Sequence, residues 1–226
     1  MALAGEAEAC GYVTFVAANT RPNPVPLCPE ITLRVADRAV PLWLKTAEEI
    51  DDMGISPPFW AFAWAGGQAL ARFVLDQPKW VRGKRVLDLG AGSGLVGIAA
   101  RLSGAASVTC ADPDPWAQAA IELNADMNAV QLDLTGQNLL ALPEEPLPFA
   151  CDIVLVGDLF YEQPLAERVL RFLSTQRAAD RMVLIGDPGR SYLPKDRLVR
   201  MAEYGVPAAG ELEDADIKRT AVWRLA

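Results

Sequence analysis

Three glycines at alternate positions follow a short apolar run and precede a segment with helical periodicity. The turn consists of Gly90, Ala91, Gly92 and Gly94, after the run Arg85–Leu89 and before residues 95–102. Glycine lets the backbone turn tightly and lets a ligand approach with no Cβ in the way. In a doubly wound sheet, such a turn lies beside the point where ligands bind. The pattern therefore favours a nucleotide site, the alternative being a strand-to-helix turn that is merely tight.

Two carboxylates accompany this turn. Asp88 precedes the first glycine by two residues, and Asp112 follows a second apolar run, Ser107–Ala111. The spacing is G-x-G-x-G, not the G-x-G-x-x-G with which dinucleotide folds bind a pyrophosphate. A carboxylate here would repel a pyrophosphate but suits the cationic sulfonium and ammonium groups of S-adenosylmethionine. Because an acid at the end of the second strand can accept both ribose hydroxyl protons, the sequence predicts S-adenosylmethionine as cofactor and S-adenosylhomocysteine as its product.

The adenine ring of such a cofactor needs apolar walls and a polar edge. Trp116 follows Asp112 closely and can stack on the ring, with ordinary helix-to-sheet packing as an equal alternative. Asn138 or Gln137, after the third predicted strand, can bond the exocyclic amine or be a solvated loop residue. We take Trp116 and Asn138 as cofactor-binding residues.

The segment Asp158-Leu-Phe-Tyr161 follows the fourth predicted strand, where the transferred methyl group would be presented. It lacks the two prolines of the Asn/Asp-Pro-Pro-Tyr/Phe signature of enzymes that methylate planar amide or base nitrogens. A carboxylate beside an aromatic ring suits an aliphatic ammonium instead. We therefore expect Asp158 to capture and orient a lysine, Tyr161 to wall the channel, and Phe160 to lie at the substrate. The alternative for Asp158 is a helix N-cap ahead of Pro164.

Strands and helices alternate through the middle of the chain. Strands are predicted at 85–89, 107–111, 130–134, 151–157 and 181–186, and helices at about 67–76, 95–102, 116–127 and 164–174. Near-continuous apolar strands between amphipathic helices indicate a parallel sheet covered on both faces. Residues 201–206 and 218–225 are expected to add an antiparallel edge hairpin. The predicted fold class is α/β, a Rossmann-like doubly wound sheet of seven strands, mostly parallel.

The N-terminal part does not follow this alternation. It predicts a helix over about 5–20, an extended proline-rich link over 21–29, and a hairpin of Ile31–Val35 with Val40–Leu42. We divide the chain into an N-terminal helix and hairpin extension, residues 1–58, and an α/β domain, residues 59–226.

Composition excludes several classes of function. The 226 residues are 51% hydrophobic and carry a formal net charge of −8, which disfavours nucleic acid as a partner. The chain has no histidine and its four cysteines form no CxxC pair, which excludes Ser-His-Asp triads and leaves a zinc site almost no ligands, so no metal is expected. Cys110 and Cys151 lie in apolar runs and are predicted to be reduced core thiols. The acidic N-terminus and the lack of a run of about 20 apolar residues predict a cytoplasmic protein without a membrane segment, and we expect a monomer.

Two narrower motifs carry a resemblance to a known group. Gly157-Asp-Leu-Phe-Tyr-Glu162 and Leu184-Ile-Gly-Asp-Pro-Gly-Arg190 resemble the seven-β-strand (class I) protein-lysine methyltransferases. Within this group the chain is most similar to the electron-transfer flavoprotein β-subunit lysine methyltransferase family, as a bacterial member. The similarity runs from about Pro24 to the C-terminus and includes Leu123-Asn124 and Thr220-Ala-Val-Trp223. The first residues, to about 20, show no usable resemblance.

The resemblance implies a class I methyltransferase domain over 59–226, with S-adenosylmethionine as donor and lysines of the flavoprotein β-subunit as acceptor. It assigns cofactor binding to Asp88, Gly90, Gly92 and Asp112, and to Trp64 at the methionine end of the cofactor. It matches Asp158 and Tyr161 to the acid-x-x-aromatic motif of the family, which makes them the candidate catalytic residues. Asp187 and Arg190 become candidate substrate-binding residues.

The mechanism expected is direct in-line transfer to a neutral lysine amine, with alignment and a dry channel supplied by the protein. Other acceptors remain open, namely a ribosomal protein, a small molecule or RNA, because this core serves many substrates. The acidic balance argues against RNA. A non-catalytic binding module and a nicotinamide enzyme are further alternatives, disfavoured by the intact motif and by the glycine spacing.

Overall fold

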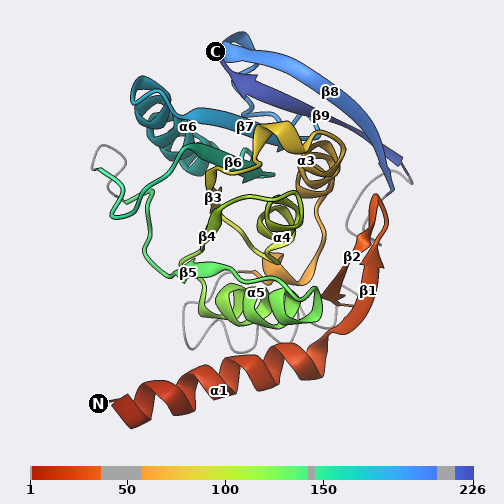
Figure 1. Cartoon of the computed structure of the whole chain (residues 1–226), viewed down its shortest axis with the longest axis vertical. Coiled ribbons are helices and arrows are strands. Elements are labelled where there is room, and N and C mark those ends of the chain that lie inside the picture. Colours follow the sequence, from red (N-terminus) through yellow and green to blue (C-terminus); the bar gives the residue numbers. More distant parts are fainter. Residues whose placement is uncertain (1, 37–56, 142–145, 208–216) are drawn as a thin grey trace.

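The computed structural model describes residues 2–36, 57–141, 146–207 and 217–226. Within them, the centre of the molecule is a seven-stranded sheet with the strand order β5-β4-β3-β6-β7-β9-β8 (Figure 1). Its strands are β3 (Arg85–Leu89), β4 (Ser107–Ala111), β5 (Asp133–Thr135), β6 (Ile153–Gly157), β7 (Met182–Asp187), β8 (Leu198–Pro207) and β9 (Ile217–Leu225). Neighbours among β3 to β7 pair in parallel, whereas β9 pairs antiparallel with both β7 and β8. The predicted mostly parallel sheet with an antiparallel C-terminal edge is confirmed.

Helices cover both faces of this sheet. They are α3 (Ala65–Asp76), α4 (Leu95–Leu102), α5 (Pro115–Met127) and α6 (Gln163–Ala178), with short 3₁₀ helices η1 (Phe59–Ala61), η2 (Pro78–Trp80) and η3 (Lys195–Arg197). On β6, Ile153 and Leu155 pack into a cluster with residues of α3 and α4, whereas Val154 and Val156 pack into a cluster with residues of α6. Since side chains alternate across a strand, both faces of β6 are buried, which explains its continuous apolar sequence.

Element boundaries match the predictions closely where the chain is most apolar. β3, α4 and β4 have the predicted bounds. The third strand begins at Asp133 instead of Val130, and Val130 and Leu132 pack against the cluster around β2 and α4. Cys110 and Cys151 are buried and unpaired, as expected of core thiols.

The N-terminal segment wraps against this core. It comprises α1 (Ala2–Asn19), β1 (Arg21–Val25) and β2 (Cys28–Val35), and β1 and β2 form a separate antiparallel pair. The proline-rich link is therefore extended, as predicted. Unlike the prediction, its residues Arg21–Val25 form strand β1, which pairs with the predicted strand Ile31–Val35. The predicted partner Val40–Leu42 lies outside the described residues. Pro22 and Pro24 are two positions apart, so both missing N–H groups lie on the same edge of β1, where a strand tolerates them.

α1 lies alongside α5 at the end of the molecule away from β8 (Figure 1). No helix in the described ranges has both the length and the apolar character needed to cross a membrane.

Candidate functional site

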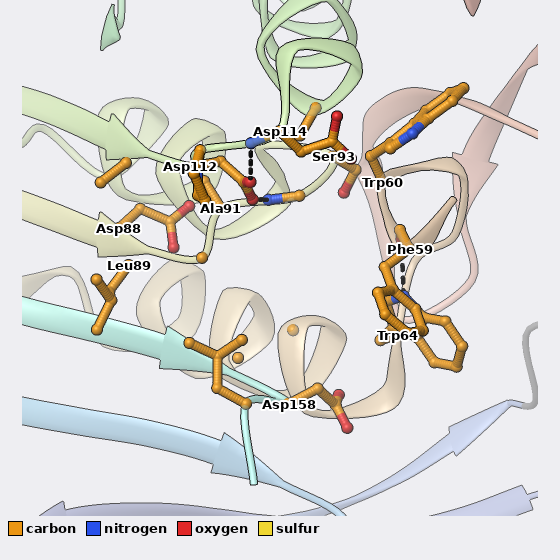
Figure 2. A pocket seen from close by; sticks show the side chains of 18 of the residues that line it. Phe59, Trp60, Trp64, Asp88, Leu89, Ala91, Ser93, Asp112, Asp114 and Asp158 are labelled. Atoms are coloured by element: carbon orange, nitrogen blue, oxygen red, sulfur yellow. Dashed lines mark hydrogen bonds between the residues drawn. The ribbon is translucent and has the colours of Figure 1, made fainter. Parts of the chain in front are cut away.

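A cavity of about 920 Å³ opens at the carboxyl ends of β3, β4 and β6, where strand order reverses and parallel sheets bind ligands (Figure 2). It is lined by most residues predicted from the sequence: Trp64, Asp88, Gly90, Ala91, Gly92, Asp112, Trp116, Asn138, Asp158, Tyr161 and Arg190. Gly94, Phe160 and Asp187 do not line it. The volume is that of a site for a small molecule of nucleotide size.

The glycine turn keeps one side of the cavity free of side chains. Gly92 has a φ of 53°, and a Cβ added there would meet no atom closer than the Cα of Trp60, at 3.9 Å. Gly94 has a φ of 79° and faces inward, where a Cβ would lie 3.2 Å from the Ile121 side chain. Gly92 therefore leaves room for a ligand, whereas Gly94 serves the packing of α4 on α5.

Asp112 fixes the shape of this turn. Its Oδ2 accepts a hydrogen bond from the Gly92 N–H at 2.9 Å, and its Oδ1 accepts one from the Asp114 N–H at 3.1 Å. Burial raises the pKa of Asp112, and these two backbone donors oppose the rise. Each carboxylate oxygen has a second lone pair, so Asp112 can still accept from ligand hydroxyls.

Asp88 lies deeper, with 1% of its surface exposed. Its Oδ2 accepts a hydrogen bond from the Gly97 N–H at 2.8 Å. Burial raises the pKa of Asp88 to about 7, the Gly97 N–H opposes the rise, and the charge of Asp112 adds to it. A cation bound in the cavity would favour the ionised form, which is the electrostatic complement expected for S-adenosylmethionine.

This raised pKa makes the ligand-free protein less stable as pH rises. The carboxyl group of Asp88 binds its proton more tightly folded than unfolded, where its pKa is about 3.9. The stability that the protonated Asp88 contributes is therefore fully present below about pH 4 and is lost as pH rises through about 7. In the wild type, Asp88 should lower the unfolding free energy by up to about 3 kcal/mol between pH 5 and 8. Asp88→Asn keeps an acceptor for the Gly97 N–H but does not titrate, so this decrease should be absent from the variant.

Urea denaturation of the ligand-free wild type and of Asp88→Asn at both pH values measures this difference. Glu30→Gln is a matched control, because Glu30 is an exposed carboxylate on β2 whose pKa is lowered by its hydrogen bond to Arg72. Parallel pH dependences of the wild type and Asp88→Asn would contradict the assignment.

Asp158 lies at the other end of the cavity (Figure 2) and is already paired. Its Oδ1 accepts from the Arg190 guanidinium, at 2.7 Å from Nε and 2.6 Å from an Nη, and its Oδ2 accepts from the Gly66 N–H in the first turn of α3. Asp158 is 6% exposed, and burial raises its pKa while Arg190 opposes the rise. The sequence predicted that the Asp158 carboxylate captures a lysine; in the structure this carboxylate is already paired with Arg190. Nor does Asp158 cap α6, whose N-cap residue is Glu162.

Aromatic side chains form the wall next to Asp158. The Trp64 indole N–H donates to the Phe59 carbonyl at 2.8 Å, and the Phe59 ring lies 5.3 Å from Tyr161 and 5.9 Å from Trp64. The Arg190 guanidinium lies 5.9 Å from the centre of the Trp64 ring, within cation–π distance. Phe59 was not predicted as a site residue, although it stands in an aromatic run of the sequence, Phe59-Trp60-Ala-Phe62-Ala-Trp64.

At the opposite end lie the residues proposed for adenine. Trp116 is 8% exposed and is the second residue of α5, where its backbone N–H donates to the Asp114 carboxylate at 2.8 Å. Asn138 lies in the loop after β5, and its Oδ1 accepts from the Leu140 N–H at 3.1 Å. Tyr12 of α1 also lines this end, and no signal in the sequence pointed to it.

Two predicted substrate residues lie elsewhere. Phe160 is fully buried in the cluster under α6, because Asp158 has a φ of 59° and the chain turns there so that Tyr161, not Phe160, lines the cavity. Asp187 is also fully buried, and its Oδ1 accepts from the Gly189 and Arg190 N–H groups at 2.6 and 2.8 Å. The geometry gives Asp187 the role of shaping the loop that carries Arg190.

Comparisons with known proteins agree with this geometry. Residues 43–198 match the model of a lysine methyltransferase family. The chain is 37% identical over 203 residues to the electron transfer flavoprotein beta subunit lysine methyltransferase of Rattus norvegicus, covering 87% of this chain and 77% of that protein. It is 36% identical over 216 residues to the Xenopus laevis protein of the same name, covering 93% and 85%.

Among solved structures, the chain resembles the magnesium protoporphyrin IX methyltransferase of Synechocystis, determined with bound S-adenosylmethionine. The TM-score is 0.51 at 17% identity, over 71% of this chain and 80% of that one. This likeness bears on the fold alone.

Proposed function

The chain belongs to the lysine methyltransferase family, and from this premise we propose that it transfers methyl groups from S-adenosylmethionine to lysines of the electron-transfer flavoprotein β-subunit. The observation that carries the proposal is one cavity with two chemically different ends. The glycine turn, Asp112 and Trp116 form one end, and the aromatic wall with the Asp158–Arg190 pair forms the other. A nucleoside and a lysine need these two environments side by side.

The residues present fit S-adenosylmethionine. Gly92 leaves open space where a Cβ would stand, and Asp112 keeps acceptor capacity for hydroxyl groups. Asp88 is buried at the cavity, and its ionised form, which a bound cation would favour, complements a cationic ligand. When bound, this cofactor supplies a methyl group that is already activated by its positively charged sulfur. The task of the protein is then to bind, align and exclude water.

The aromatic wall favours the neutral form of the acceptor amine. A free lysine has a pKa of about 10.4, and desolvation against Phe59, Trp64 and Tyr161 would lower it. Arg190 is paired with Asp158, so this pair presents no net negative charge that would favour an ammonium. The proton would leave to water before transfer. Asp158 does not capture the lysine directly in this scheme; it positions Arg190 and the start of α3, which carries Gly66.

The proposal is tested by incubating the purified protein with radiolabelled S-adenosylmethionine and recombinant electron-transfer flavoprotein from the same organism. We expect label on the β-subunit, assigned to lysines by peptide mass spectrometry. The same flavoprotein with its lysines chemically acetylated beforehand is the matched control and should take up no label, because an amide nitrogen is not a nucleophile. Label in a ribosomal-protein fraction, with none on the flavoprotein, would keep the methyltransferase and refute the substrate.

A further inference from the structure

The N-terminal helix contributes a side chain to the cavity although it precedes the part of the chain that matches the family model, residues 43–198. Tyr12 of α1 lines the cavity, and its ring meets Trp116 edge-on, with centroids 5.1 Å apart and planes at 82°. Phe15, one turn further along, also contacts Trp116, at 6.2 Å, but does not line the cavity. Two neighbouring aromatics of one helix thus meet the same indole, one inside the cavity and one outside.

α1 is held firmly enough to place Tyr12. Val16 is fully buried in a cluster with Trp60, Phe62 and Trp116. The guanidinium of Arg34 on β2 donates to the Ala17 carbonyl at 2.7 Å near the end of the helix. The cavity wall at Tyr12 is therefore part of the folded structure.

A chain of hydrogen bonds links this anchor to the glycine turn. The Arg34 N–H donates to Asn124 Oδ1 at 2.8 Å, and Asn124 Nδ2 donates to the Ser93 carbonyl at 2.8 Å. Asn124 is fully buried on α5, and Ser93 lies between Gly92 and Gly94. Strand β2, which holds α1, is thus also linked through the Asn124 side chain to the glycine turn that shapes the cavity.

Tyr12 lies at the nucleoside end of the cavity. Its partner Trp116 is the second residue of α5. This helix begins directly after Asp114, whose backbone N–H donates to Asp112. Trp64 and Asp158 mark the other end, and Figure 2 shows Asp158 well apart from Asp112 and Asp114. In an edge-to-face pair the edge of one ring covers one face of the other, so the pair itself still leaves ring faces uncovered for a further stacking contact.

We propose that Tyr12 is a cofactor-binding residue, and that α1 supplies one wall of the subsite for the adenosine moiety of S-adenosylmethionine. The inference rests on the proposed function for the identity of the nucleoside. Tyr12 and Trp116 together form an aromatic corner against which a flat purine packs, and the Tyr12 hydroxyl adds a polar group at its rim. Residues before the matched family segment therefore determine cofactor affinity.

Isothermal titration calorimetry with three ligands separates this role from general packing. S-adenosylmethionine, S-adenosylhomocysteine and 5′-methylthioadenosine share the adenosine, and the last lacks the amino-acid end. We expect Tyr12→Ala to weaken binding of all three by about tenfold, the loss of one aromatic contact. Tyr12→Phe, which keeps the ring, should stay within about threefold of the wild type.

Phe15→Ala is the matched control, because it removes the other ring on Trp116 without opening the cavity. It is expected to lower the thermal midpoint and to change the three dissociation constants less than about threefold. If Tyr12→Ala bound the ligands as tightly as the wild type, or if Tyr12→Ala and Phe15→Ala lost affinity equally, the role of Tyr12 would be refuted and the proposed function would stand. A folded wild type that binds none of the three ligands would overturn the proposed function and this inference with it.

Discussion

Replacing Asp158 with asparagine is expected to lower the single-turnover rate of lysine methylation by about a hundredfold at saturating S-adenosylmethionine. Asparagine keeps an acceptor for the Gly66 N–H and tolerates the φ of 59° at this position. It removes the charge that pairs with Arg190, whose guanidinium lies over Trp64 in the acceptor wall. A displacement of about 1 Å among aligned groups costs about this much in rate. Rapid-quench assays on the labelled flavoprotein measure the effect.

The control is the double variant Asp158→Asn with Arg190→Gln. Removing one member of a buried pair leaves the other unpaired, so the double variant should unfold at a higher temperature than Asp158→Asn alone. Its transfer rate should stay low, because the cation is missing from the acceptor wall. If Asp158 instead captured the lysine ammonium, Asp158→Asn would mainly raise KM for the protein substrate, and Arg190→Gln would leave the rate unchanged.

Gly186→Ala should have the largest effect on stability, lowering the unfolding free energy by roughly 3 kcal/mol. The backbones of α3 and β7 touch at two glycines. A Cβ on Gly186 would lie 2.0 Å from the Gly66 carbonyl oxygen and 2.8 Å from the Leu70 Cβ, and a Cβ on Gly66 would lie 2.3 Å from the Gly186 carbonyl oxygen. The two nearest obstacles are backbone carbonyl oxygens, so relief requires a shift of the helix from the sheet. For a chain of this size, we expect the thermal midpoint to fall by about 6–12 °C.

Gly11→Ala is a matched control for this substitution. Gly11 lies inside α1, and a Cβ there would meet nothing within 4 Å. Alanine is the better helix former by about 1 kcal/mol, so Gly11→Ala should leave the thermal midpoint unchanged or raise it. Equal midpoints for Gly186→Ala and the wild type would show that α3 can move away from β7 at little cost.

The central sheet could be predicted because its strands are buried on both faces. The run Ile153–Val156 is continuously apolar, and Val86–Leu89 is interrupted only by Asp88. Residues in such runs must be buried, so the sequence shows where these strands lie. The N-terminal pairing could not be predicted in the same way. Pro22 and Pro24 argue against a strand, and only the position of β1 at an edge makes them acceptable.

The site was predictable where backbone motifs define it and less so where tertiary contacts do. The glycine turn and Asp112 follow from strand ends, which the sequence locates. The pairing of Asp158 with Arg190 depends on a loop set by Asp187, and the orientation of Phe160 depends on the positive φ of Asp158. Tyr12 comes from a helix whose contact with α5 has no signature in the sequence. These residues required the three-dimensional structure.

The position of β9 between β7 and β8 has a consequence for synthesis on the ribosome. β8 is made before β9 yet joins the sheet only through β9, which pairs with β7. The edge of β7 therefore stays open while the 38 residues after Asp187, residues 188–225, are added. At usual translation speeds this interval lasts roughly 2–8 s. An open strand edge is a template for pairing with foreign strands. Until β9 has paired with β7, this edge is therefore a place where the nascent chain can misassemble.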